Sequence, residues 1–122
     1  MTRGLLLFAH GARDPRWALP FEAVARRIRD EHPALALELA YLEFMSPGVL
    51  EAGERLVAAG CLSVDVLPLF LGAGGHVRKD LPEWLQLLGA ENPAVRWRLL
   101  PAIGEAESVV TAMAAEALRL LE

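Results

Sequence analysis

Several features that would assign a chain to a familiar class are scarce or missing here. One cysteine, Cys61, occurs in 122 residues, so no internal disulfide can form, and Cys61 is best explained as a small buried hydrophobic residue. No apolar run approaches the roughly 18 residues that a membrane-spanning helix needs. The N-terminus also lacks the pattern of a signal peptide. We therefore expect a cytoplasmic protein with no membrane partner.

A net positive charge and nucleotide-binding motifs are also missing. The chain has 12 Lys and Arg against 16 Asp and Glu, a net charge of −4, which argues against a nucleic-acid partner. The glycine-rich segment at residues 72–77 lacks the third glycine of the dinucleotide motif, and no Gly-Lys-Ser/Thr follows it. The sequence therefore contains no recognisable ATP-binding motif.

Apolar residues are abundant, at 54% of the chain against 23% charged residues. This balance suits a single domain, residues 1–122, built on a parallel sheet that is covered on both faces. Short apolar runs alternate with segments of helical periodicity. The expected strands are residues 4–9, 35–41, 62–70 and 95–99, and the expected helices follow at 15–30, 47–59, 80–91 and 105–121. Asp14-Pro15 is expected to cap an irregular first turn and Ser46-Pro47 to cap the second helix, while Asp80 and Glu83 have the spacing of a capping box for the third. Regular strand pairing is expected to fade near Leu67, because Pro68 cannot donate a hydrogen bond.

Four β-α units in succession predict an α/β fold with a four-stranded parallel sheet and right-handed crossovers. The expected strand order is 2-1-3-4, a shortened flavodoxin-like arrangement with helices on both faces. The first and third strands are then neighbours, about 4.8 Å apart. Ligands bind such sheets in the crevice outside the carboxyl ends of these strands.

Two of the three histidines follow the most apolar strands. His10 ends the first strand, and His76 follows the third strand after a glycine-rich loop. Imidazoles bind divalent metals and accept protons near neutral pH. Glu43, after the second strand, can serve as a third ligand or a proton acceptor, or it can be a solvated surface residue. His32 ends a helix, where a structural role is expected. Because so few ligands are on offer, we expect an open metal site rather than a closed four-ligand zinc site.

Four cations surround the predicted crevice in an otherwise acidic chain: Arg13, Arg16, Arg78 and Lys79. Such a cluster suits a small polyanionic ligand with carboxylates or phosphates. Gly74 and Gly75 can form a flexible lid, or they can lie flat against a large planar ligand.

A family resemblance rests on these same residues. The motifs that carry it are LLLFAHGARDPRW, AYLEFMSPGVLEAG and VDVLPLFLGAGGHVRKDLPE, which occur in this order within about residues 3–85. Together they resemble the short-form sirohydrochlorin cobaltochelatases (CbiX type) of the class II chelatase superfamily. The last third of the chain is generic by comparison.

The resemblance implies insertion of a divalent metal into a sirohydrochlorin-type tetrapyrrole without ATP, and a homodimer that assembles the cleft from two copies. It implies that His10 and His76 bind the metal and help remove the pyrrole protons, with a weaker assignment for Glu43. It also implies that the substrate's carboxylates meet the cationic rim. We expect no cofactor beyond the metal substrate itself.

Several alternatives remain open. Co²⁺ in cobalamin synthesis is the first hypothesis, with Fe²⁺ insertion for sirohaem and Ni²⁺ insertion next, because ligand type separates these ions poorly. A non-catalytic tetrapyrrole or metal carrier would use the same residues without turnover. A flavodoxin-like domain that binds a phosphorylated ligand would retain phosphate affinity after loss of both histidines.

Overall fold

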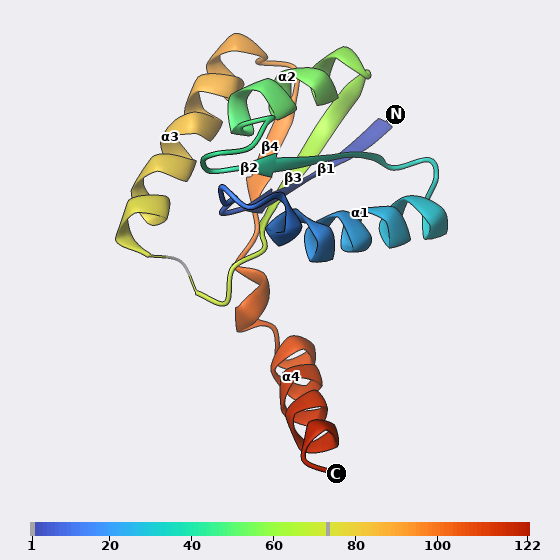
Figure 1. The fold of residues 1–122 in the computed structure, drawn as a ribbon. Coiled ribbons are helices and arrows are strands. Elements are labelled where there is room, and N and C mark those ends of the chain that lie inside the picture. The colour runs from blue at the N-terminus through green and yellow to red at the C-terminus, as the bar shows by residue number, and fades with distance from the viewer. Residues whose placement is uncertain (1, 73) are drawn as a thin grey trace.

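Helices cover both faces of a four-stranded sheet in the computed structural model (Figure 1). The structure describes residues 2–72 and 74–122, with the backbone alone at position 76. None of the helices it describes is long and apolar enough to cross a membrane. In chain order the elements are β1 (Thr2–Ala9), η1 (Pro15–Ala18), α1 (Leu19–Glu31), β2 (Ala36–Tyr41), α2 (Val49–Ala58), β3 (Cys61–Pro68), α3 (Gly75–Glu91), β4 (Arg96–Leu99), η2 (Ile103–Glu105) and α4 (Glu107–Leu120), where η marks a short 3-10 helix.

The sheet is parallel throughout, with the strand order β2-β1-β3-β4. This confirms the order predicted from the sequence. Phe8 on β1 pairs with Ala40 on β2 and with Pro68 on β3. Pairing therefore continues to Pro68 instead of fading near Leu67 as expected. The three strands end together, which brings the loops that follow them to one edge of the sheet.

The core lies in two layers, one on each face of the sheet. β1 is central, so its successive residues Leu6, Leu7 and Phe8 are all fully buried although they point to opposite faces. Leu7 packs with Ala25 of α1 on one face. On the other face α2 and α3 cover the larger cluster, which includes Leu6, Phe8, Leu56, Val64, Val66, Leu81 and Leu88.

One helix start matches the cap predicted from the sequence, and two others lie at different residues. As predicted, Asp14 caps the irregular first turn, accepting a hydrogen bond from the Arg16 amide before α1 begins. α2 begins at Val49 and not at the predicted Ser46-Pro47 cap, because the Pro47 carbonyl accepts from the Tyr41 amide (2.9 Å) and holds this segment beside β2.

α3 begins at Gly75, one turn earlier than the predicted start near Asp80. The reason is local: the Arg78 amide already donates to the Gly74 carbonyl (3.0 Å), which makes Gly74 the N-cap. Asp80 consequently lies inside the helix, so the expected capping box with Glu83 does not start it. Residue 76 falls in the first helical turn instead of a preceding loop.

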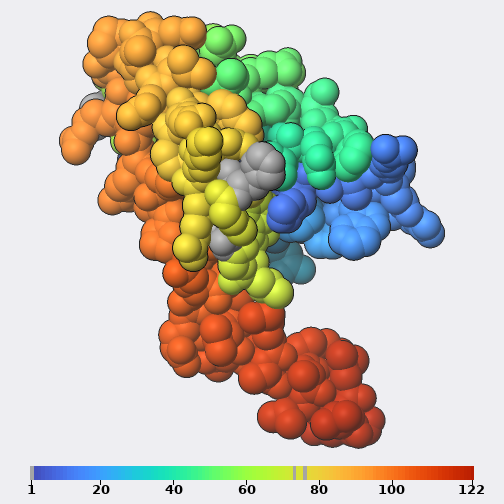
Figure 2. Space-filling model, turned by 90° about the vertical axis from the view of Figure 1, so that its left-hand side faces the viewer, coloured from blue at the N-terminus to red at the C-terminus, as the bar shows by residue number. Residues whose placement is uncertain are grey.

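The last helix, α4, leaves the body of the molecule (Figure 1). It packs mainly against η2, and none of its residues is buried. Figure 2 shows the same helix projecting beyond the sheet and its covering helices. Its apolar side chains therefore face solvent, including Met113 and Leu120, which are 43% and 66% exposed.

Candidate functional site

The loops after β1 and β2 are joined at the carboxyl edge of the sheet. The Leu42 amide donates to the Ala9 carbonyl (2.9 Å), and the Glu43 amide donates to the His10 carbonyl (3.1 Å). These two bonds continue the pairing of Ala9 with Tyr41 beyond the strands. His10 and Glu43 are therefore neighbours along the backbone, as the predicted strand order requires.

Gly11 makes this approach possible. Its φ is +81°, a left-handed conformation that favours glycine. A Cβ at this position would collide with the Glu43 carbonyl oxygen and would lie 3.3 Å from the Tyr41 Cβ. The residue that follows His10 must therefore lack a side chain if the two loops are to touch.

The His10 imidazole is exposed and lies against a residue that follows β3. Its ring centroid is 4.3 Å from that of Phe70, with 37° between the ring planes. Phe70 is itself 5% exposed and packs edge-on against Phe8 in the core, with centroids 5.4 Å apart. A rigid aromatic support thus presents one face of His10 to solvent at this edge.

The other predicted histidine is only partly described. The backbone of residue 76 lies in the first turn of α3, after the loop that follows β3, and the His76 side chain lies outside the described residues. Gly74 and Gly75 are exposed at the start of this helix, with no atom within 4 Å of a Cβ built on either one. Arg78 and Lys79 are exposed just beyond them.

An apolar pocket of about 410 Å³ adjoins His10. Trp17 and Phe44 form its aromatic wall. Neither was predicted as a site residue, although Trp17 lies close in sequence to Arg13 and Phe44 directly follows Glu43. The Arg13 guanidinium carbon lies 5.0 Å from the centre of the Phe44 ring. The complete lining is His10, Gly11, Ala12, Arg13, Trp17, Phe21, Tyr41, Phe44 and Leu69.

One of the four predicted cations is already paired with a carboxylate two residues away. The Arg16 guanidinium pairs with the Asp14 carboxylate, with a shortest N–O distance of 2.6 Å. This pairing lowers the pKa of Asp14 and raises the pKa of Arg16. Local neutralisation makes Arg16 a weaker candidate than expected for holding an anionic ligand, whereas Arg13 remains at the pocket.

Among the side chains that the structure describes, a set without that of residue 76, no three His, Cys, Asp or Glu side chains gather into a metal site. Glu43 is exposed, and its backbone amide donates to the His10 carbonyl. The geometry therefore joins the Glu43 backbone to the His10 loop.

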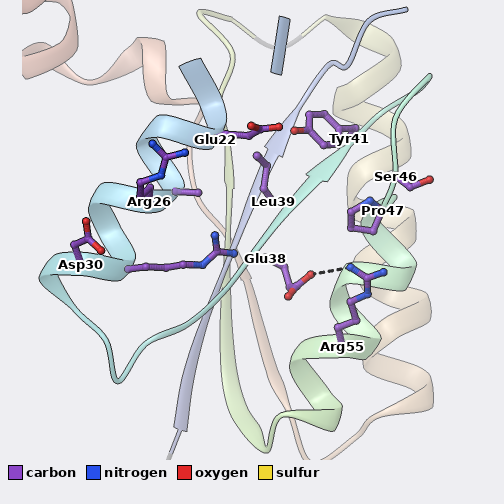
Figure 3. A pocket seen from close by; sticks show the side chains of 11 residues that line it. Glu22, Arg26, Asp30, Glu38, Leu39, Tyr41, Ser46, Pro47 and Arg55 are labelled. Carbon is purple, nitrogen blue, oxygen red and sulfur yellow. Dashed lines mark hydrogen bonds and ion pairs between the residues drawn. The ribbon is translucent and has the colours of Figure 1, made fainter. Parts of the chain in front are cut away.

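A second groove, of about 570 Å³, runs along the exposed edge of β2 between α1 and α2 (Figure 3). It contains charges of both signs, including Glu38, which pairs with Arg55 at 3.3 Å. Glu22 and Tyr41 point toward each other at one end, and burial, with the Glu22 charge, raises the pKa of Tyr41. The mixed charge makes this groove less suited to a polyanion than the edge at His10.

Solved structures with this architecture include a chelatase and a CbiX protein. The Bacillus subtilis sirohydrochlorin chelatase SirB, determined with cobalt, superposes with a TM-score of 0.84 at 25% identity over 98% of this chain and 51% of its own. A CbiX protein of Marinobacter aquaeolei superposes with a TM-score of 0.84 at 33% identity over 98% and 97% of the two chains. The fold and its histidine-bearing edge thus define a chelatase-like α/β protein.

More specifically, the chain belongs to the CbiX family, whose model matches residues 4–120. Among curated relatives, the sirohydrochlorin cobaltochelatase of Methanococcus aeolicus is 29% identical over 87 residues. That alignment covers 71% of this chain and 61% of the relative, somewhat less than two thirds of its length.

Proposed function

We propose that this protein inserts a divalent metal ion, with Co²⁺ first, into sirohydrochlorin as a step of cobalamin biosynthesis. The observation that carries the proposal is the exposed His10 imidazole, supported on Phe70 beside an apolar pocket at the carboxyl edge of the sheet. Its support from relatives is the CbiX family match, the cobaltochelatase named in Methanococcus aeolicus and the cobalt-containing structure of SirB.

Metal insertion requires a partly desolvated cation and the loss of two pyrrole N–H protons from the macrocycle. A neutral imidazole can either bind the incoming cation or accept a proton, and we assign these tasks to His10 together with His76. Glu43 is proposed as an auxiliary proton acceptor, because its backbone bond to His10 keeps it at the same edge.

The tetrapyrrole is proposed to lie across this edge, with part of its apolar ring system in the pocket at His10. Arg13, Arg78 and Lys79 would bind its carboxylates, with a lesser contribution from Arg16. The exposed backbone of Gly74 and Gly75 allows a flat ligand to approach closely, since neither residue has a nearby atom where a side chain would begin.

We also propose that the protein acts as a homodimer. SirB matches this chain over only 51% of its own length, although 98% of this chain is covered, so a single chain of SirB has room for a second unit of this size. The exposed apolar side chains of α4 support association as well. The cytoplasm is the proposed compartment, consistent with the single buried thiol of Cys61.

Ion pairs occupy part of the sheet face that could otherwise receive α4 of the same protomer. On the face opposite the Val64 and Val66 layer, Asp65 binds Arg98 (2.9 Å) and lies 3.8 Å from Arg3. An apolar helix gains more by packing against another apolar surface than against this ion-paired face. A second copy of α4 provides such a surface.

The deciding experiment is an anaerobic absorbance assay with sirohydrochlorin and Co²⁺. We expect catalysed metallation by the wild type and a loss of about a hundredfold or more, the scale of one general acid–base group, in His10→Ala and in His76→Ala. His32→Ala is the matched control, since His32 caps the far end of α1 and should retain full activity.

Repeating the assay with Fe²⁺ and Ni²⁺ ranks the metals and tests the sirohaem alternative. Binding of the tetrapyrrole without any acceleration over the uncatalysed reaction would replace the chelatase proposal with the carrier. Phosphate binding that survives loss of both histidines would support the flavodoxin-like alternative instead.

A further inference from the structure

Phe44 has an unusual backbone conformation for an aromatic residue. Its φ is +66°, and among the residues that the structure describes it is the one non-glycine residue in the left-handed region. Bulky side chains are disfavoured there by contacts with the backbone. Its ring is 58% exposed, so burial in the core does not compensate for this conformation. Another role must account for a strained, exposed aromatic ring.

The backbone before Phe44 is fixed to the His10 loop. The Glu43 amide donates to the His10 carbonyl (3.1 Å), and Gly11 packs directly against the Glu43 carbonyl. The turn at Phe44 therefore starts from a point that is rigid relative to His10. From there its ring lies beneath the Arg13 guanidinium, at 5.0 Å, within the range of a cation–π contact.

Arg13 is held by this ring and not by an acidic side chain. Among the described residues, no carboxylate pairs with Arg13, whereas its neighbour Arg16 is engaged by Asp14. Arg13 and Phe44 both line the apolar pocket, with Trp17 on the same wall. The stacked guanidinium thus keeps its hydrogen-bond donors available for an anion at the mouth of that pocket.

We propose that Phe44 is a positioning residue, which holds Arg13 so that its guanidinium binds a carboxylate of a planar ligand seated in this pocket. The ligand class is an anionic macrocycle whose apolar edge contacts Trp17 on the wall of this pocket. The identity of the natural ligand as sirohydrochlorin rests on the proposed function, but the positioning of Arg13 does not.

The test measures the affinity for a metal-free porphyrin that carries eight carboxylates. Binding is detected by the quenching of tryptophan fluorescence, because Trp17 lines the pocket. Arg13→Ala should weaken binding about tenfold, the scale of one charge-assisted contact. Phe44→Leu keeps an apolar side chain but loses the cation–π contact, and it should weaken binding about two- to fivefold. Leu62→Ala, an exposed apolar residue on β3 distant from the pocket, is the control and should bind normally.

A double-mutant cycle separates positioning from a direct contact. If Phe44 acts through Arg13, then Phe44→Leu has no further effect in the Arg13→Ala protein. Fully additive effects would overturn the proposal, because they would mean that Phe44 acts independently of the guanidinium. A porphyrin with the same ring but cationic substituents should bind the wild type and Phe44→Leu with equally low affinity. A difference in affinity between these two proteins would also overturn the proposal.

Phe44→Asn provides a second, independent measurement. Asparagine tolerates the left-handed conformation better than phenylalanine, so this variant should have a higher melting temperature while binding the anionic porphyrin more weakly. A structural role for Phe44 predicts the opposite change in melting temperature, and such a result would contradict the proposal.

These binding experiments also separate this inference from the proposed function. They involve no metal insertion, so coupling between Arg13 and Phe44 in a protein that fails to metallate sirohydrochlorin would leave this inference standing and reject the chelatase activity. Conversely, an active chelatase whose KM and porphyrin affinity are unchanged by Phe44→Leu would reject the inference alone.

Discussion

Gly11 lies directly against the backbone carbonyl of Glu43, which leaves no room for a side chain, and its φ is +81°. This contact joins the loop that carries His10 to the loop that carries Glu43 and Phe44. Three of the side chains that line or flank the pocket therefore depend on one glycine for their relative placement. Replacing Gly11 by alanine tests this dependence.

Gly11→Ala should destabilise the protein by about 2 kcal/mol or more, since it combines left-handed strain with a backbone collision. Gly60→Ala is the matched control for strain alone, because Gly60 has a φ of +91° and open space around it, and it should cost about 1 kcal/mol. Gly72→Ala should be nearly neutral. Urea unfolding gives the three free energies, and equal losses for Gly11→Ala and Gly60→Ala would contradict the collision.

Two helical glycines near Trp97 should respond to alanine in opposite directions. A Cβ on Gly53 of α2 would lie 2.7 Å from a methyl carbon of Leu88, which is fully buried in α3. Overpacking of this kind costs about 1–3 kcal/mol, which outweighs the gain of up to about 1 kcal/mol in helix propensity. Gly53→Ala should therefore destabilise the protein.

Gly89 in α3 is the counterpart, because its nearest neighbour, Trp97, would lie at an ordinary contact distance of 3.8 Å from a new Cβ. Gly89→Ala should stabilise the protein by up to about 1 kcal/mol. Thermal unfolding of both variants checks the pair, and the same sign for both would show that the α2–α3 contact is packed differently.

α4 should determine the oligomeric state. A charge placed among its exposed apolar residues, as in Met113→Glu, should convert a dimer to a monomer, because a buried unpaired carboxylate costs several kcal/mol. Thr111→Glu adds the same charge on the opposite side of the helix and should leave the dimer intact. Light scattering on a gel-filtration column measures both, and a monomeric wild type would refute the role of α4.

Stability at alkaline pH should depend on Tyr41. Burial, together with the charge of Glu22, raises the pKa of Tyr41 above its usual 10.0, because the folded protein disfavours the phenolate. The contribution to stability is thus complete below pH 10 and is lost as the pH rises through the folded pKa. Since Tyr41 is the one tyrosine in the chain, the absorbance of tyrosinate follows its titration directly.

Tyr41→Phe removes this titration and should flatten the fall in unfolding free energy above pH 10. Burial also raises the pKa of the Cys61 thiol, so Cys61→Ala serves as a control that leaves the tyrosine contribution in place. Parallel pH profiles for the wild type and Tyr41→Phe would contradict a buried, protonated phenol.

The sequence was most informative where a pattern repeats along the chain. Apolar runs and helical periodicity predicted all four strands and the order β2-β1-β3-β4, and this order brings the end of β1 beside the end of β3. The cap at Asp14 followed from its position before a proline. These features depend on near neighbours in sequence or on general rules of parallel sheets, which is why they could be predicted.

The predicted starts of two helices were wrong, because backbone hydrogen bonds and not the side-chain capping motifs determine where these helices begin. Ser46 does not cap α2, since the following Pro47 carbonyl is bonded to Tyr41. Asp80 does not start α3, since helical bonding already begins at Gly74. Arg16 was grouped with the free cations, although Asp14, only two residues away, pairs with it.

The sequence by itself determined the parallel fold and the placement of His10 after a central strand. Only the tertiary structure decided that Phe70 supports His10, that Phe44 lies under Arg13, and that α4 stands apart from its own sheet. Those contacts join residues from 31 to 60 positions apart, and they depend on strand register and loop geometry, which local sequence patterns do not encode.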